Sequence, residues 1–141
     1  MNNSTALDDI TRGITFEFFG CGQHKIEIED LLATEDGILL HVRAVPEWES
    51  IQLKMKHHIN VLWIPTEEIP DRLNEIPRNK TVGIFCTNGP RSAAVYLYLR
   101  SKAYEHVRIA PGNYDAITSL LLPGKLFKFL NEHRTAEHDR K

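Results

Sequence analysis

The chain has 141 residues, which is enough for one domain with a buried core. Its 17 basic and 19 acidic side chains give a net charge of −2, which argues against binding to nucleic acid or to a membrane surface. No apolar run approaches the roughly 18 residues of a membrane span, and the polar N-terminus lacks the features of a signal peptide. Two cysteines are too few for a disulfide scaffold, so we expect a cytoplasmic protein in a reducing environment.

The chain is expected to consist of an N-terminal extension, one main domain and a tail. The extension covers residues 1–23, of which residues 1–13 are polar and expected to be loose. Apolar and polar side chains alternate over residues 14–19, which predicts a short strand. The main domain is expected over residues 24–130, and residues 131–141 form a charged C-terminal tail.

Strands and helices are expected to alternate along the main domain. Near-continuous apolar runs predict strands buried on both faces over residues 37–42, 61–64 and 81–85, and a further strand is expected over residues 106–109. This order predicts an α/β fold of three layers, with a mostly parallel central sheet and helices on both faces. A functional site is then expected at the carboxyl ends of the strands. The other expected elements are a short strand over 26–27 and helices over 28–32, around 46–48, and over 71–76, 92–100 and 114–130.

Two of these helices carry more specific predictions. Thr66 is expected to be the N-cap of the helix that precedes the third strand. In the helix that follows this strand, Ala94, Leu97 and Tyr98 recur at helical spacing and are expected to face the core.

The stretch from Cys86 to Ser92, Cys-Thr-Asn-Gly-Pro-Arg-Ser, carries the pattern of a chemical site. It lies between a buried strand and a helix, so the cysteine is expected at the carboxyl end of the strand. Loop N–H groups and a helix N-terminus favour negative charge, and Arg91 adds a positive charge nearby. These features favour the thiolate, the nucleophilic form of cysteine. A buried structural cysteine is the plainer alternative, but it would need no such polar loop after it.

The spacing Cys-x-x-Gly-x-Arg-Ser after a strand resembles the active-site loop of rhodanese-type sulfurtransferases. The resemblance extends over residues 24 to 120, so it is more than a single motif. It is carried by Leu39-Leu40-His41-Val42-Arg43 with Glu47-Trp48, by His58-Ile59 with Trp63-Ile64-Pro65, and by Tyr104-Glu105-His106-Val107-Arg108 with Pro111-Gly112-Asn113. These segments resemble the family's "L-D-V-R", "G-H-I…I-P" and "G-Y-x-x-V" patterns.

The resemblance implies a rhodanese-like domain that transfers sulfane sulfur through a persulfide on Cys86. The donor would be thiosulfate, a polysulfide or a small persulfide, and the acceptor cyanide or a thiol, including one on a protein. No metal or organic cofactor and no nucleic-acid or membrane partner is implied, and the oligomeric state is left open. The persulfide cradle would comprise Thr87, Asn88, Gly89, Arg91 and Ser92, and structural support would come from Arg43, Glu47 and His58.

Arg91 has two candidate roles, binding an anionic donor or tying the loop to a carboxylate such as Glu47, and we expect mainly the structural one. Ser92 is expected to be the polar first turn of the helix and not a second nucleophile.

Loop length separates sulfur transfer from a related chemistry. Four residues lie between Cys86 and Arg91, whereas the phosphatases that share this fold have five. The tighter ring suits one extra sulfur atom and disfavours a phosphatase or an arsenate reductase. A non-catalytic rhodanese-like binding or regulatory module is the other alternative, although such modules usually lose the cysteine.

The chain departs from the family pattern at several positions. Pro90 has no backbone N–H, which removes one donor from the loop but also stiffens it. His41 stands where the family usually has aspartate, so any contact made by that carboxylate is absent. Asn113 replaces a second glycine and tolerates the same turn. The uncharged side chains between Cys86 and Arg91 weaken the case for thiosulfate, a dianion, as the best donor.

Two further features invite functional interpretations. His57 and His58 are adjacent, so in an extended segment they face opposite sides and no metal site is expected. Cys21 lies between two glycines and is either a spectator or a second thiol that reaches Cys86. We expect a spectator.

Overall fold

The structure, a computed structural model, describes residues 5–50, 59–85, 89–112 and the single positions 117, 119, 124, 127, 128 and 131. Several expectations lie outside the described residues. They concern His57, His58, Cys86, Thr87, Asn88 and Asn113, most of the expected helix over 114–130, and the tail.

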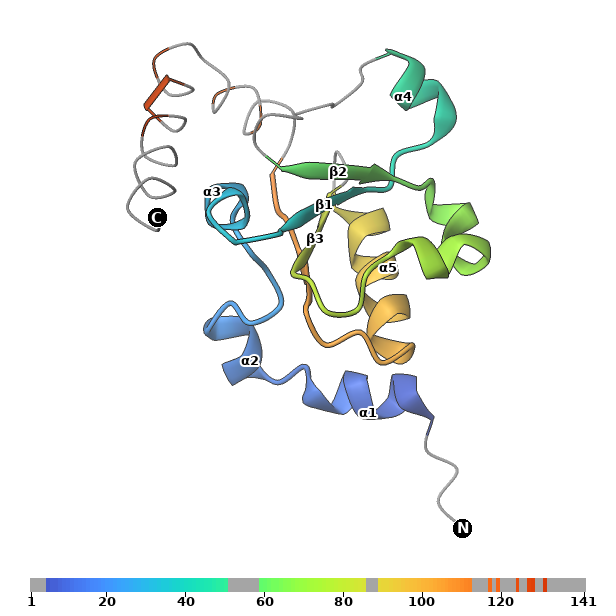
Figure 1. Ribbon diagram of the computed structural model, residues 1–141. Helices are drawn as coiled ribbons and strands as arrows, with labels where there is room; N and C mark the ends of the chain where they lie inside the picture. The colour runs from blue at the N-terminus through green and yellow to red at the C-terminus, as the bar shows by residue number, and fades with distance from the viewer. Residues whose placement is uncertain are drawn as a thin grey trace.

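The centre of the fold is a four-stranded sheet (Figure 1). Its strands are β1 (Ile38–His41), β2 (Asn60–Trp63), β3 (Val82–Phe85) and β4 (Val107–Ile109), in the order β2-β1-β3-β4. All three neighbouring pairs are parallel. Every residue of β1 and β3 is buried, as the continuous apolar runs of the sequence predicted for a sheet covered on both faces.

Helices cover both faces of this sheet, which confirms the expected three-layer α/β fold. They are α1 (Ala6–Gly13), α2 (Phe16–Gly20), α3 (Ile28–Leu32), α4 (Val45–Ser50), the 3-10 helix η1 (Thr66–Glu75) and α5 (Pro90–Ser101). Figure 1 shows α3 and α5 on opposite sides of the strands. Successive residues of β1 serve the two sides: Leu40 belongs to the core shared with α5 and η1, and Leu39 to the core shared with α3.

The described part of the N-terminal extension contains two helices, and the expected strand over residues 14–19 is wrong. Thr5 and Asp8 form a capping box at the start of α1, in which each side chain accepts the backbone N–H of the other residue. The Thr15 side chain accepts the N–H of Phe18 and so caps α2. Two local caps therefore outweigh a short alternation of apolar residues.

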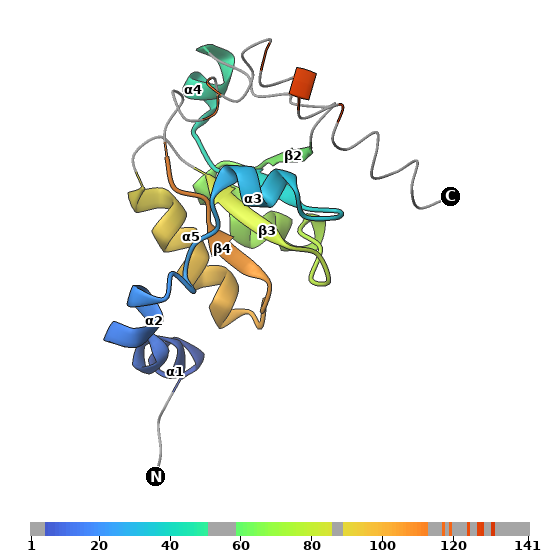
Figure 2. The ribbon, with the colours of Figure 1, turned by 90° about the vertical axis from the view of Figure 1, so that its left-hand side faces the viewer.

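The expectation that residues 1–13 are loose is also wrong for the part that α1 covers. This helix packs against α5, and α2 follows it on the same side of the molecule (Figure 2). Within the described residues no helix has the length and apolar character needed to cross a membrane.

Three smaller expectations need correction. Residues 26–27 form no strand: Lys25 makes an isolated parallel bridge to Ile109. Thr66 is not an N-cap, because the helix starts after Pro65 and the Thr66 hydroxyl donates to the carbonyl of Val42 at 3.0 Å. The remaining correction concerns which residues of α5 face the core.

The buried face of α5 is offset from the expected one. Ala94 is exposed, so that expectation is wrong, whereas Leu97 and Tyr98 are half-buried and pack against the core as expected. The buried positions are Ser92, Val95, Tyr96 and Leu99, which recur at the same helical spacing. The sequence did not indicate this face because Ser92 is polar. Its hydroxyl donates a hydrogen bond within the first turn of α5, so the residue can be buried.

Candidate active site

The carboxyl ends of β1 and β3 lie side by side. His41 pairs with Phe85 across the two strands, and the N–H of Val42 donates to the carbonyl of Phe85 at 3.1 Å. Phe85 ends β3, and Cys86 follows it in the sequence. The described chain resumes at Gly89, so Cys86 and the next two loop residues lie outside it.

Helix α5 begins immediately after this loop. Gly89 has a φ of +94°, a conformation that glycine adopts without the cost of a Cβ atom. Pro90 occupies the first helical position, where its fixed φ suits the helix and its missing N–H costs no helical hydrogen bond. The expected strand before Cys86 is therefore present, and the expected helix after it starts at Pro90 instead of Ser92.

Ser92 belongs to the first turn of α5. Its side-chain oxygen donates to the carbonyl of Gly89 at 2.8 Å, and the residue is only 2% exposed. The N–H of Ala93 donates to the same carbonyl at 3.0 Å. This bonding agrees with the expectation that Ser92 shapes the helix start.

Arg91 is held by Glu47 of α4 through two hydrogen bonds. Nη1 donates to Oε1 at 2.5 Å and Nη2 to Oε2 at 3.0 Å. Glu47 Oε1 also accepts the N–H of Ala44 at 3.1 Å. The hydrogen bonds from Arg91 are the main reason that the pKa of Glu47 is lowered to about 2, so this carboxylate is ionised at neutral pH. This ion pair ties α5 to α4, and the structural role of Arg91 in the site stays a prediction.

Arg43 is the second cation at this edge of the sheet. It follows β1, is 1% exposed, and donates through Nε to Nε2 of His41. His41 is fully buried and stacks on Phe85, with ring centroids 5.7 Å apart. Burial and then the Arg43 guanidinium lower the pKa of His41 to about 3, so its imidazole is neutral near pH 7.

Two tryptophans brace α4 against the sheet. Trp48 and Trp63 stack with ring centroids 4.6 Å apart and planes within 7°. Trp63 Nε1 donates to the carbonyl of Arg43 at 3.0 Å, and the Trp48 ring lies 5.5 Å from that of His41. These contacts connect Arg43 and α4, the helix that carries Glu47, to β2.

The structure thus gathers Arg43, Glu47, Gly89, Arg91 and Ser92 around the carboxyl ends of β1 and β3. Two features escaped the sequence analysis, namely the contact between His41 and Arg43 and the stacked tryptophans. The two-residue spacing from position 41 to position 43 was a signal for the first of these, because side chains two residues apart in extended chain lie on one face. Nothing in the sequence pointed to the tryptophan pair.

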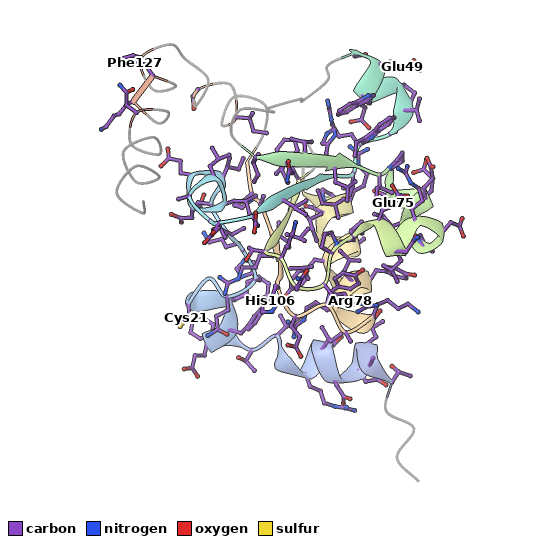
Figure 3. All side chains as sticks on the ribbon, in the orientation of Figure 1. Cys21, Glu49, Glu75, Arg78, His106 and Phe127 are labelled. Carbon is purple, nitrogen blue, oxygen red and sulfur yellow. The ribbon has the colours of Figure 1, made fainter. Side chains whose placement is uncertain are left out.

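Cys21 lies apart from this edge. It is exposed and follows α2, and Figure 3 shows it on the opposite side of the molecule from Glu49 of α4. Its relation to Cys86 stays a prediction, since Cys86 is not among the described residues.

The fold and this edge define an α/β domain with a cysteine loop between a central strand and a helix. The family model "Rhodanese-like domain" matches residues 25–120. The chain therefore belongs to the rhodanese-like domain family, which confirms both the family and the fold expected from the sequence.

Individual relatives are sulfurtransferases by name. A "Sulfurtransferase" of Allochromatium vinosum is 32% identical over 77 residues, which are 55% of this chain and 67% of that protein. A "tRNA sulfurtransferase" of Escherichia coli O157:H7 is 28% identical over 90 residues, which are 62% of this chain but 18% of that protein. The chain thus spans less than a fifth of the tRNA sulfurtransferases that it matches. The solved rhodanese-like domain protein of Staphylococcus aureus has a TM-score of 0.54 and 26% identity, over 65% of this chain and 88% of that one.

Proposed function

We propose that this chain is a sulfurtransferase that carries sulfane sulfur as a persulfide on Cys86. One observation carries the proposal, namely the elements on either side of Cys86. Strand β3 ends at the residue before Cys86, and α5 starts four residues after Cys86. Arg91 in the first turn of α5 is fixed to Glu47. The names of the sulfurtransferase relatives support the same class of reaction.

The reaction is a double displacement at sulfur. The Cys86 thiolate attacks the sulfane sulfur of the donor, a new S–S bond forms, and the donor's own bond to that sulfur breaks. The bonding electrons leave with the donor remnant, which is sulfite from thiosulfate or a thiolate from a small persulfide. An acceptor thiolate or cyanide then attacks the outer sulfur of Cys86–S–S⁻ and restores the Cys86 thiolate. The protein undergoes no net oxidation.

The surrounding charges favour the anionic states in this cycle. The N-terminus of α5 contributes a partial positive charge, to which Arg91 and Arg43 add full charges. Arg91 is shared with Glu47, which reduces the charge it offers to a doubly charged donor. We therefore propose a polysulfide or a small persulfide as a better donor than thiosulfate.

The acceptor is proposed to be a thiol on a small molecule or a protein. The name of the Escherichia coli relative refers to tRNA, but the net charge of −2 of this chain does not favour nucleic acid. The reaction needs Cys86 in its reduced state, so we assign it to a reducing compartment such as the cytoplasm. The four-residue spacing from Cys86 to Arg91 disfavours phosphatase chemistry, and the presence of Cys86 disfavours a purely regulatory module.

Mass spectrometry after incubation with polysulfide tests this proposal. We expect Cys86 to gain the mass of one sulfur atom in the wild type and in Cys21→Ser, and the sulfur to pass to a thiol or to cyanide. Cys86→Ser should gain no sulfur at this position and should show no turnover. Turnover retained in Cys86→Ser, with an unchanged far-UV circular dichroism spectrum, would refute the mechanism.

A further inference from the structure

His41 is an uncharged side chain buried beside a buried cation. The residue is fully buried between the rings of Phe85 and Trp48. Its Nε2 accepts a hydrogen bond from Arg43, so the single ring proton belongs on Nδ1. Adding a proton at Nε2 would point a second donor at the guanidinium. The geometry therefore keeps the imidazole neutral, which agrees with its low pKa.

His41 lies beside the last described residue before the cysteine loop. His41 pairs with Phe85, the residue before Cys86. The next residue of that edge, Val42, donates its N–H to the carbonyl of Phe85. A charge placed at position 41 would therefore lie one strand spacing away from the start of the cysteine loop.

The described charges around His41 are two guanidinium groups and one carboxylate. Arg43, Glu47 and Arg91 all act electrostatically on the His41 ring. Glu47 already shares its two oxygens with Arg91. A carboxylate at position 41 would bring a second negative charge to this edge and would pair with Arg43, whereas imidazole holds the same guanidinium without changing the charge.

We propose that His41 is a positioning residue that holds the Arg43 guanidinium at the carboxyl edge of β1 without cancelling its charge, and so favours the anionic forms of Cys86. This inference rests on the proposed function, in which the thiolate and the persulfide of Cys86 are the working states. It assigns a role to the position at which this chain departs from the aspartate usual in the family.

Two isosteric pairs of variants separate charge from shape. The first pair is His41→Asp and His41→Asn. The second pair is His41→Glu and His41→Gln, whose longer side chains reach further toward Arg43. Within each pair the side chains have the same size and differ by one charge. Other contacts of Arg43 are common to both members, so they cancel in the comparison. Far-UV circular dichroism establishes which pair is folded, and the comparison is made with that pair.

The measurement is the rate of iodoacetamide alkylation of Cys86 against pH, followed on the Cys86 peptide by mass spectrometry. We expect the acidic member of a pair to have a midpoint about one unit higher than its amide partner, because a nearby negative charge disfavours the thiolate. Below both midpoints, alkylation of the acidic variant should be about tenfold slower. The amide variants should stay close to the wild type.

Equal midpoints in the acidic and amide members of a folded pair would overturn the proposal, and so would a lower midpoint in the acidic member. This readout does not depend on turnover. If wild-type Cys86 takes up no sulfur from polysulfide, the proposed function fails, while the difference between the paired variants still decides the role of His41.

Discussion

The ion pair between Glu47 and Arg91 should contribute measurably to stability, and Glu47→Gln tests it. The pKa of Glu47 falls from an ordinary value of 4.5 to about 2, chiefly through its hydrogen bonds with Arg91. At about 1.4 kcal/mol for each unit, the upper limit of this stabilisation is about 3.5 kcal/mol. The Arg91 and Glu47 side chains remain 31% and 34% exposed, so water screens the pair, and we expect a loss of about 1–2 kcal/mol at pH 7.

Urea denaturation at several pH values is the assay, with Glu49→Gln as the matched control. Glu49 is on the same helix and is exposed, so its replacement should change the free energy of unfolding by less than about 0.5 kcal/mol. A carboxyl whose pKa is lowered by folding stabilises the protein above its unfolded pKa. The advantage of the wild type over Glu47→Gln should therefore be complete at pH 7 and shrink as the pH falls from about 4.5 toward 2.

Two results would refute this reasoning. One is a Glu47→Gln variant as stable as the wild type at pH 7. The other is a stability difference that stays constant through the acid range, since this would show that the carboxylate charge is not the cause.

Three further predictions concern the loop and the second thiol. Gly89→Ala should lower the free energy of unfolding by about 1–2 kcal/mol, because alanine is strained at a φ of +94°. Gly13→Ala in α1 should raise it by about 0.5–1 kcal/mol, and thermal unfolding of both variants checks these values. Pro90→Asn restores a backbone N–H at the start of α5 and should lengthen the persulfide lifetime; identical lifetimes would show that this position does not face the sulfur. Cys21→Ser should leave turnover unchanged, and non-reducing peptide mapping after polysulfide treatment should reveal no disulfide between Cys21 and Cys86; finding that disulfide would contradict the spectator role.

The central strands of the sheet were predictable because they depend on a short local pattern. Strands buried on both faces of a parallel sheet must be apolar at successive positions, and residues 38–41 and 82–85 are nearly so. The start of α5 was missed by two residues: the helix begins at Pro90 and not at Ser92, because Gly89 adopts a φ of +94° and Pro90 suits the first helical position.

The N-terminal helices were missed because two local signals compete in the same few residues. The alternation over residues 14–19 favours a strand, while Thr15 offers a cap to the N–H of Phe18. A five-residue helix has too few residues to show a clear helical period. The capping box of Thr5 and Asp8 was readable in the sequence and would have indicated a helix from Ala6.

The electrostatic character of the site required the tertiary structure. A histidine with an ordinary pKa near 6.5 can be charged or neutral at physiological pH, so the sequence alone leaves the charge at position 41 open. Burial against Phe85 and Trp48, together with the hydrogen bond from Arg43, selects the neutral form. The neutral imidazole therefore adds no charge to the edge that carries Arg43, Glu47 and Arg91.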